Sequence, residues 1–126
     1  DPATGGLSIV GSAVASGAIN AIGIEPSGKY LYVTTGFAVE GFAIDGATGL
    51  LQPIPNGSFS GNVRPQALAI GPSGTFLFAP DNSSNAVIAL SINQNDGALT
   101  PVPGSPFPLD PSYTLGLGPT SIAVSR

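Results

Sequence analysis

A hairpin-like stretch that occurs twice constrains the fold of this chain more than any other feature. Ile22 to Thr35 reads as a strand, a Pro-Ser-Gly turn and a second strand with alternating side chains. The same pattern returns, altered, at Leu68 to Asp81. Pro presets the first corner of a tight turn, and Gly accepts the positive φ that the second corner often needs. A unit of this kind that recurs along a chain indicates a repeat architecture.

Each copy of the hairpin is followed by two further short runs with strand character. The first is an alternating apolar strand, and the second is rich in Pro, which suits an outer strand whose backbone donors need no partner. The first strand of each copy consists mainly of small and apolar residues, as expected where strands crowd around an axis. Four short antiparallel strands in a unit of about 46 residues are typical of a β-propeller blade. We therefore predict an all-β fold built from four-stranded propeller blades.

The pattern divides residues 1–126 into a single propeller segment with about two full blades and partial blades at both ends. Residues 17–60 and 64–107 form the two blades, 1–16 the last strand of a preceding blade, 108–118 a linker rich in Pro and Gly, and 119–126 the first strand of a following blade. Propellers close with at least four blades. The segment is therefore part of a larger propeller, or copies of it pair their open sheet edges; a different closed all-β fold is the third alternative.

Composition excludes several classes of function. The chain has three Lys and Arg residues against seven acids, and these few cations are scattered, which argues against nucleic acid as a partner. It contains no Cys and no His, so it lacks thiolate chemistry and the commonest general base and metal ligand. No stretch is long and apolar enough to predict a membrane span. No cofactor is expected, and the low charged fraction of 8% favours an extracellular or cell-surface setting, with the periplasm as an alternative.

Several motifs resemble the YVTN-type repeat of lactonase-like, or 6-phosphogluconolactonase-like, seven-bladed propellers, a repeat that bacterial and archaeal surface proteins share. The resemblance covers almost the whole chain and implies the propeller fold more strongly than any function. Members with gluconolactonase activity use charged and His residues around the central channel, and this chain has no His. The motifs are Pro26 to Thr35, the Val-x-x-Phe-x-Ile-Asp strand at Val39 to Asp45, Ala-Thr-Gly-Leu-Leu at Ala47 to Leu51, Arg64 to Ile70, and Gly-Ser-Pro-Phe at Gly104 to Phe107.

Four polar residues are candidates for the rim of such a channel. Arg64 precedes the innermost strand of the second blade and is the one charged residue at a plausible rim position. Asn20, Gln66 and Thr120 occupy equivalent places in the three innermost strands. No residue is singled out as catalytic.

The loop around Asp81, Asn82 and Asn85 offers oxygen atoms of the kind that Ca²⁺ takes. We favour the alternative that these side chains hydrogen-bond their own backbone in a solvated loop, so no metal site is predicted. Glu25 and Glu40 are expected at the surface, with nothing to place them together as a carboxylate pair. Four strand aromatics form either a sugar-binding platform or, as we favour, packing between blades: Tyr30, Tyr32, Phe76 and Phe78.

These observations predict a non-enzymatic extracellular or cell-surface propeller segment that serves as a scaffold or interaction module. Its expected partners are other blades or copies of itself, paired through open sheet edges, with a fibre or surface layer as one form of assembly. The alternative is a fragment of a lactonase-like propeller enzyme that hydrolyses a sugar lactone.

Overall fold

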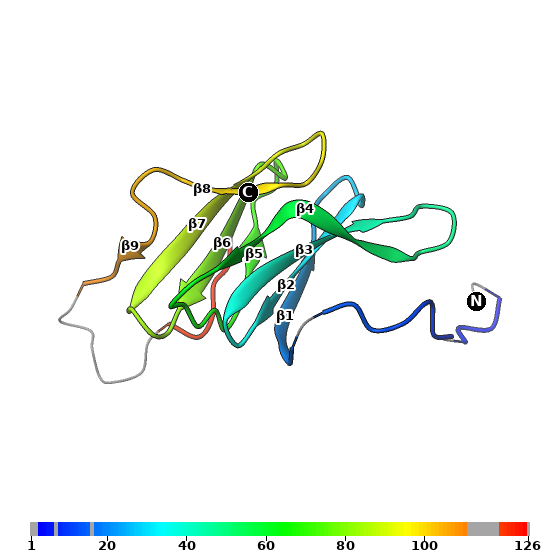
Figure 1. The fold of residues 1–126 in the computed structure, drawn as a ribbon, viewed down its shortest axis with the longest axis horizontal. Coiled ribbons are helices and arrows are strands. Elements are labelled where there is room, and N and C mark those ends of the chain that lie inside the picture. The colour runs from blue at the N-terminus through cyan, green and yellow to red at the C-terminus, as the bar shows by residue number, and fades with distance from the viewer. Residues whose placement is uncertain (1–2, 7, 16, 111–118, 126) are drawn as a thin grey trace.

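The computed structural model describes residues 3–6, 8–15, 17–110 and 119–125 and shows two antiparallel β-sheets that stand face to face (Figure 1). The first sheet has the strand order β1-β2-β3-β4, and the second has the order β5-β6-β7-β8, with β9 also paired to β7. The described residues contain no helix long and apolar enough to span a membrane. The prediction of an all-β fold made of propeller blades is confirmed.

The first sheet follows the repeat pattern strand by strand. It consists of β1 (Ile19–Ile24), β2 (Tyr30–Thr35), β3 (Ala38–Ile44) and β4 (Leu51–Ser60), each antiparallel to the next. The Pro-Ser-Gly turn joins β1 to β2, and Gly28 takes the positive φ of 74° that the turn requires. Side chains on both faces of β2 are buried, because packed residues cover this central strand on each side.

The second sheet has the same plan but an interrupted outer strand. Its strands are β5 (Ala69–Ile70), β6 (Phe76–Asp81), β7 (Ala86–Ile92), β8 (Leu99–Pro101) and β9 (Phe107–Pro108). Prolines between β8 and β9 cannot donate backbone hydrogen bonds. In the same interval the Ser105 hydroxyl accepts the hydrogen bond of the Ala89 amide over 2.9 Å, so a side chain satisfies this amide of β7.

The main core lies between the two sheets. Tyr30, Tyr32 and Val39 of the first sheet share one buried cluster with Leu77, Ile88 and Leu90 of the second. The opposite, outward face of the first sheet carries a smaller cluster of Leu31, Val33 and Phe42, against which Val14 and Ala15 of the N-terminal segment pack. Alternate residues of β2 thus face opposite sides, as the sequence pattern predicted.

The innermost strands approach each other closely. A Cβ atom at Gly23 in β1 would lie 2.5 Å from Leu68 Cδ1, so the small residues of β1 reflect the crowding that the sequence predicted. The innermost segment of the second blade is less regular than expected, because only Ala69–Ile70 forms a strand and Pro65 makes an isolated bridge to Asp81.

The flanking segments form no strand in the part of the chain that the structure describes. Residues 3–6 and 8–15, predicted as part of a last strand, and 119–125, predicted as a first strand, lack strand pairing. Their assignment to neighbouring blades stays a prediction, and the linker at 108–118 lies largely outside the described residues.

Candidate functional site

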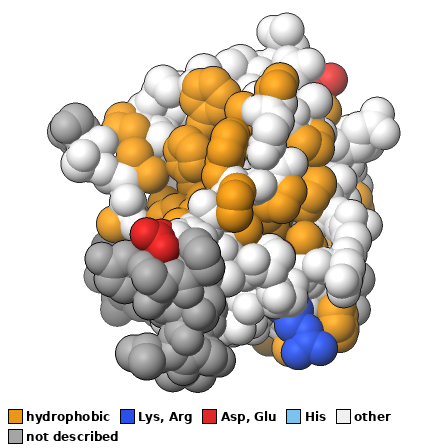
Figure 2. Space-filling view, turned by 90° about the vertical axis from the view of Figure 1, so that its left-hand side faces the viewer, with side chains coloured by type: hydrophobic (Ala, Val, Ile, Leu, Met, Phe, Trp, Pro, Cys, Tyr) orange, Lys and Arg blue, Asp and Glu red, His pale blue; other side chains and the backbone are white. Residues whose placement is uncertain are grey.

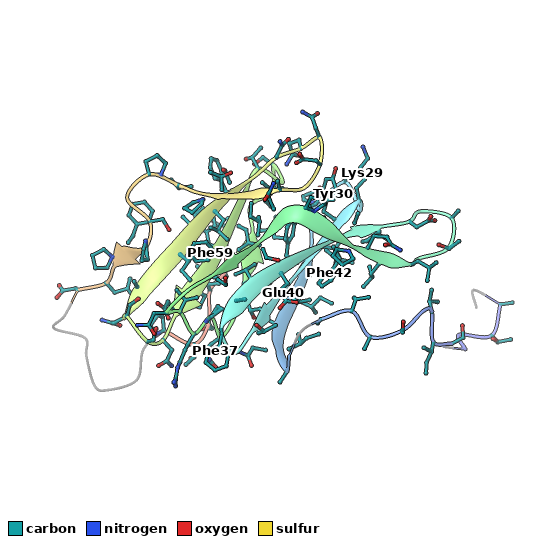
Figure 3. All side chains as sticks on the ribbon, viewed as in Figure 1. Lys29, Tyr30, Phe37, Glu40, Phe42 and Phe59 are labelled. Carbon is teal, nitrogen blue, oxygen red and sulfur yellow. The ribbon has the colours of Figure 1, made fainter. Side chains whose placement is uncertain are left out.

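Three of the four candidate residues of the channel rim, Asn20, Arg64 and Gln66, lie at one end of the two sheets, which we call the channel end. It carries the β2–β3 loop, the connector from β4 to β5 and the β6–β7 loop, all at the lower edge of Figure 1. The opposite end carries the two Pro-Ser-Gly turns. Figure 3 shows the contrast, with Phe37 at the channel end and Lys29 and Tyr30 at the other.

Arg64 is held at the channel end by its backbone. Its amide donates a 2.8 Å hydrogen bond to Asp81 Oδ1, and its carbonyl accepts one from the Asn82 amide over 3.2 Å. Val63 and Pro65 on either side are buried, whereas the Arg64 side chain is exposed. The structure thus fixes the backbone from which the Arg64 side chain extends, and the guanidinium group forms no salt bridge to any described residue.

Asp81 organises the loop that was considered for calcium. Its carboxylate is 1% exposed and accepts hydrogen bonds from the Arg64 amide, from the Ser83 amide and hydroxyl, and from the Ser84 hydroxyl. Burial raises the pKa of Asp81, but these hydrogen bonds outweigh it and hold the pKa below its ordinary value. The ionised carboxylate therefore serves to close its own loop.

In the other two residues considered as calcium ligands, Asn82 and Asn85, the structure shows a defined backbone conformation or hydrogen bond. The Asn82 amide bonds to Arg64, and Asn85 adopts a positive φ of 50°, a conformation that Asn tolerates well. Among the described residues, no group of three His, Cys, Asp or Glu side chains could hold a metal ion. Cation binding by Asp81, Asn82 and Asn85 is not tested by this structure.

Asn20 joins the innermost strands of the two blades. Its side-chain Nδ2 donates to the carbonyl of Thr35 over 3.3 Å and to the carbonyl of Pro65 over 2.9 Å. Both amide hydrogens are therefore used, which fixes the orientation of the side chain. The Oδ1 atom of Asn20 accepts no hydrogen bond from the described residues, so it can accept one from another molecule.

The remaining rim candidates are less constrained. Gln66 is half-buried and its amide donates a 3.3 Å hydrogen bond to the carbonyl of Pro80. Thr120 is exposed in a segment without strand pairing. The structure therefore ties Asn20 and Arg64 to the channel end through hydrogen bonds with the backbone, and Gln66 lies on the connector that leads into β5.

The expectation that Glu25 lies at the surface is wrong. Glu25 is 2% exposed, and its carboxylate accepts hydrogen bonds from the Ser27 amide and hydroxyl and from the amides of Lys29 and Tyr30. Burial raises its pKa, but these donors together lower it below the ordinary value. Glu25 stabilises the turn at the end opposite to the channel end, whereas Glu40 is half-buried in β3.

The favoured packing role of the strand aromatics holds for the first blade. Tyr30 and Tyr32 lie in the core between the sheets, and the Tyr32 hydroxyl donates a 2.8 Å hydrogen bond to the carbonyl of Gly97 in the second blade. Their counterparts Phe76 and Phe78 stand 6.4 Å apart between ring centroids on the outward face of the second sheet. Figure 2 shows hydrophobic side chains gathered on this side of the molecule.

Phe37 is a residue that the sequence analysis did not single out. It lies in the β2–β3 loop at the channel end and is 68% exposed, more than Phe76 or Phe107. The one signal in the sequence that could have identified Phe37 is an aromatic residue after Thr-Gly in a loop. The corresponding loop of the second blade has small and polar residues at these positions.

The comparisons with known proteins agree with this architecture. Residues 8–109 match the family described as lactonase, 7-bladed beta-propeller. Two solved structures, candidate 6-phosphogluconolactonases from Bacteroides fragilis and Bacteroides uniformis, are each 26% identical to the chain with a TM-score of 0.59. The match covers 64% of this chain but only 23% and 24% of theirs, so the chain spans about a quarter of their length. No curated protein matches. Because the family match extends over most of the sequence, the chain belongs to the seven-bladed β-propeller lactonase family.

Proposed function

We propose that this chain supplies two adjacent blades of a lactonase-like propeller enzyme that hydrolyses a sugar lactone. The single observation that carries the proposal is Arg64, whose backbone is held beside an innermost strand while its side chain is exposed. Family membership and the likeness to candidate 6-phosphogluconolactonases support the same function. They favour this alternative over the non-enzymatic scaffold that the composition predicted.

The chemistry of lactone hydrolysis gives Arg64 a defined role. Attack of water on the lactone carbonyl moves negative charge onto the carbonyl oxygen, and a positioned cation stabilises that charge. The ring-opened product carries a carboxylate, to which a guanidinium can donate two parallel hydrogen bonds. Asp81 and Glu25 are poor candidates for the general base, because both carboxylates are buried, saturated with donors and lowered in pKa. We therefore assign the general base to neither of these two carboxylates.

The test is a hydrolysis assay on the intact protein that contains these blades, with 6-phosphogluconolactone and gluconolactone as substrates. We expect Arg64→Ala to lower kcat/KM by about 100-fold, the effect of removing one donor to a developing oxyanion. Lys29→Ala is the matched control, because Lys29 is a cation at the opposite end (Figure 3), and its activity should equal that of the wild type. Wild-type activity in Arg64→Ala would remove Arg64 from the site, and no hydrolysis by the intact protein would refute the proposed function.

An extracellular or cell-surface location, and the pairing of copies through open sheet edges, stay predictions from the sequence. Fractionation of the source cells, and the mass of the purified protein in solution, would test them.

A further inference from the structure

Phe37 exposes an aromatic ring at the channel end without a packing role that the fold requires. The two blades share their plan, yet the β6–β7 loop that corresponds to the Phe37 loop contains Asn82, Ser83, Ser84 and Asn85. Blade packing at this end therefore does not require an aromatic residue. Phe37 is thus an aromatic residue on an exposed loop of the candidate binding face, and binding residues are found disproportionately on such loops.

Asn20 connects Phe37 to Arg64. Its amide group bonds the carbonyl of Thr35, two residues before Phe37, and the carbonyl of Pro65, the residue after Arg64. The strand end that leads into Phe37 and the segment that carries Arg64 are thus tied together by one side chain. Its remaining oxygen is a pre-oriented acceptor for a hydroxyl group.

These three groups match the chemistry of one class of ligand. The face of an aromatic ring carries partial negative charge, which suits the polarised C–H bonds of a sugar ring or chain. The Asn20 oxygen accepts a hydroxyl hydrogen, and the Arg64 guanidinium binds a carboxylate or phosphate.

We propose that Phe37, Asn20 and Arg64 form a binding surface for a sugar acid or its lactone, with Phe37 as the stacking residue that positions it. This inference rests on the proposed function for the identity of the substrate, and it adds two positioning residues that neither the family match nor the structural relatives assign.

The chain has no Trp, so a single introduced Trp reports on its own surroundings. We would titrate 6-phosphogluconate into the intact protein carrying Phe37→Trp, or Phe76→Trp as the matched control, after removing any other Trp of the intact protein. Phe76 is also an exposed Phe, but it follows the Pro-Ser-Gly turn at the opposite end. We expect a saturable change in the Trp emission of the Phe37→Trp protein and none in the control. Calorimetry gives the Kd of each variant independently of the fluorescence.

We expect Phe37→Ala to raise the Kd for 6-phosphogluconate about fivefold and Phe37→Tyr to leave it within about twofold, since the ring is kept. An unchanged Kd in Phe37→Ala, or no binding of 6-phosphogluconate or gluconate by the wild-type protein, would overturn the inference. Hydrolysis that persists alongside either result would leave the proposed function standing while this inference fails. Binding that depends on Phe37 in a protein without lactonase activity would support the inference and refute the enzymatic function.

Discussion

The hydrogen bond from Tyr32 to Gly97 gives the sharpest test of how the two blades are joined. The Tyr32 side chain is fully buried, and its hydroxyl lies 2.8 Å from the carbonyl oxygen of Gly97, in the β7–β8 turn of the other blade. Burial, followed by the negative charge of Glu25, raises the pKa of the phenol far above its usual value. Tyr32 therefore stays protonated and donates throughout the neutral pH range.

Tyr32→Phe removes this donor and leaves the Gly97 carbonyl buried without it. A neutral hydrogen bond contributes a net ~1 kcal/mol, and an orphaned buried acceptor adds a penalty of similar size. We expect the free energy of unfolding to fall by about 2 kcal/mol, because the ring still fills its place in the core. At an m-value of about 2 kcal/mol/M, the urea midpoint should fall by about 1 M.

The assay is urea unfolding followed by far-UV circular dichroism, with Tyr30→Phe as the matched control. Tyr30 lies in the same cluster, but its hydroxyl donates no hydrogen bond to another described residue. Its variant should therefore lose less than about 0.5 kcal/mol. A loss below that value in Tyr32→Phe, or equal losses in both variants, would show that the hydrogen bond does not hold the blades together.

Two further variants test the packing and the channel end. Gly41→Ala should destabilise the chain by about 2 kcal/mol, because its Cβ would lie 2.7 Å from the Gly57 carbonyl oxygen, whereas Gly36→Ala has open space and should be neutral in the same urea titration. The lowered pKa of Asp81 means that its stabilising effect is present above the ordinary value of 3.8 and is lost as pH falls through the lower folded value. Asp81→Asn should therefore be less stable than the wild type at pH 7 by about 2 kcal/mol and lose less stability between pH 5 and about pH 2. Parallel pH profiles for the two proteins would contradict this assignment.

The architecture was predictable because its signals are local or periodic. The alternation in Tyr30–Thr35 fixes which side chains face the second blade, and the positive φ of Gly28 and Gly74 is what the Pro-Ser-Gly turns require. The small residues of the innermost strand likewise indicated close approach, which the contact at Gly23 bears out. Signals of this kind repeat in both blades and therefore reinforce one another.

The parts that sequence reasoning missed depend on side-chain contacts within a turn or between distant segments. Glu25 appeared to be a surface charge, but a carboxylate that precedes a turn can accept the amide hydrogens of that turn, and here it does so while buried. The hydrogen bond from Asn20 to the carbonyl of Pro65 joins residues 45 positions apart. The local sequence around neither residue predicts it. At the irregular start of the innermost segment in the second blade, the Asp81 carboxylate accepts a hydrogen bond from the Arg64 amide, a contact between residues 17 positions apart.

The positions where the two blades differ carry more information about function than those where they agree. At the channel end, the second blade has Asp81, whose acceptors are filled by its own loop, where the first has Thr35. The first blade is tied by Asn20, which leaves an acceptor open, and its loop exposes Phe37. Both loops contain an internal hydrogen bond, since the Thr35 hydroxyl donates to the carbonyl of Ala38 over 3.4 Å, but the first blade also presents an exposed ring and an open acceptor. The polar loop of the second blade shows that packing at this end does not require an exposed aromatic ring. This difference supports the position that we propose for the sugar-acid ligand, over the first blade and beside the connector that carries Arg64.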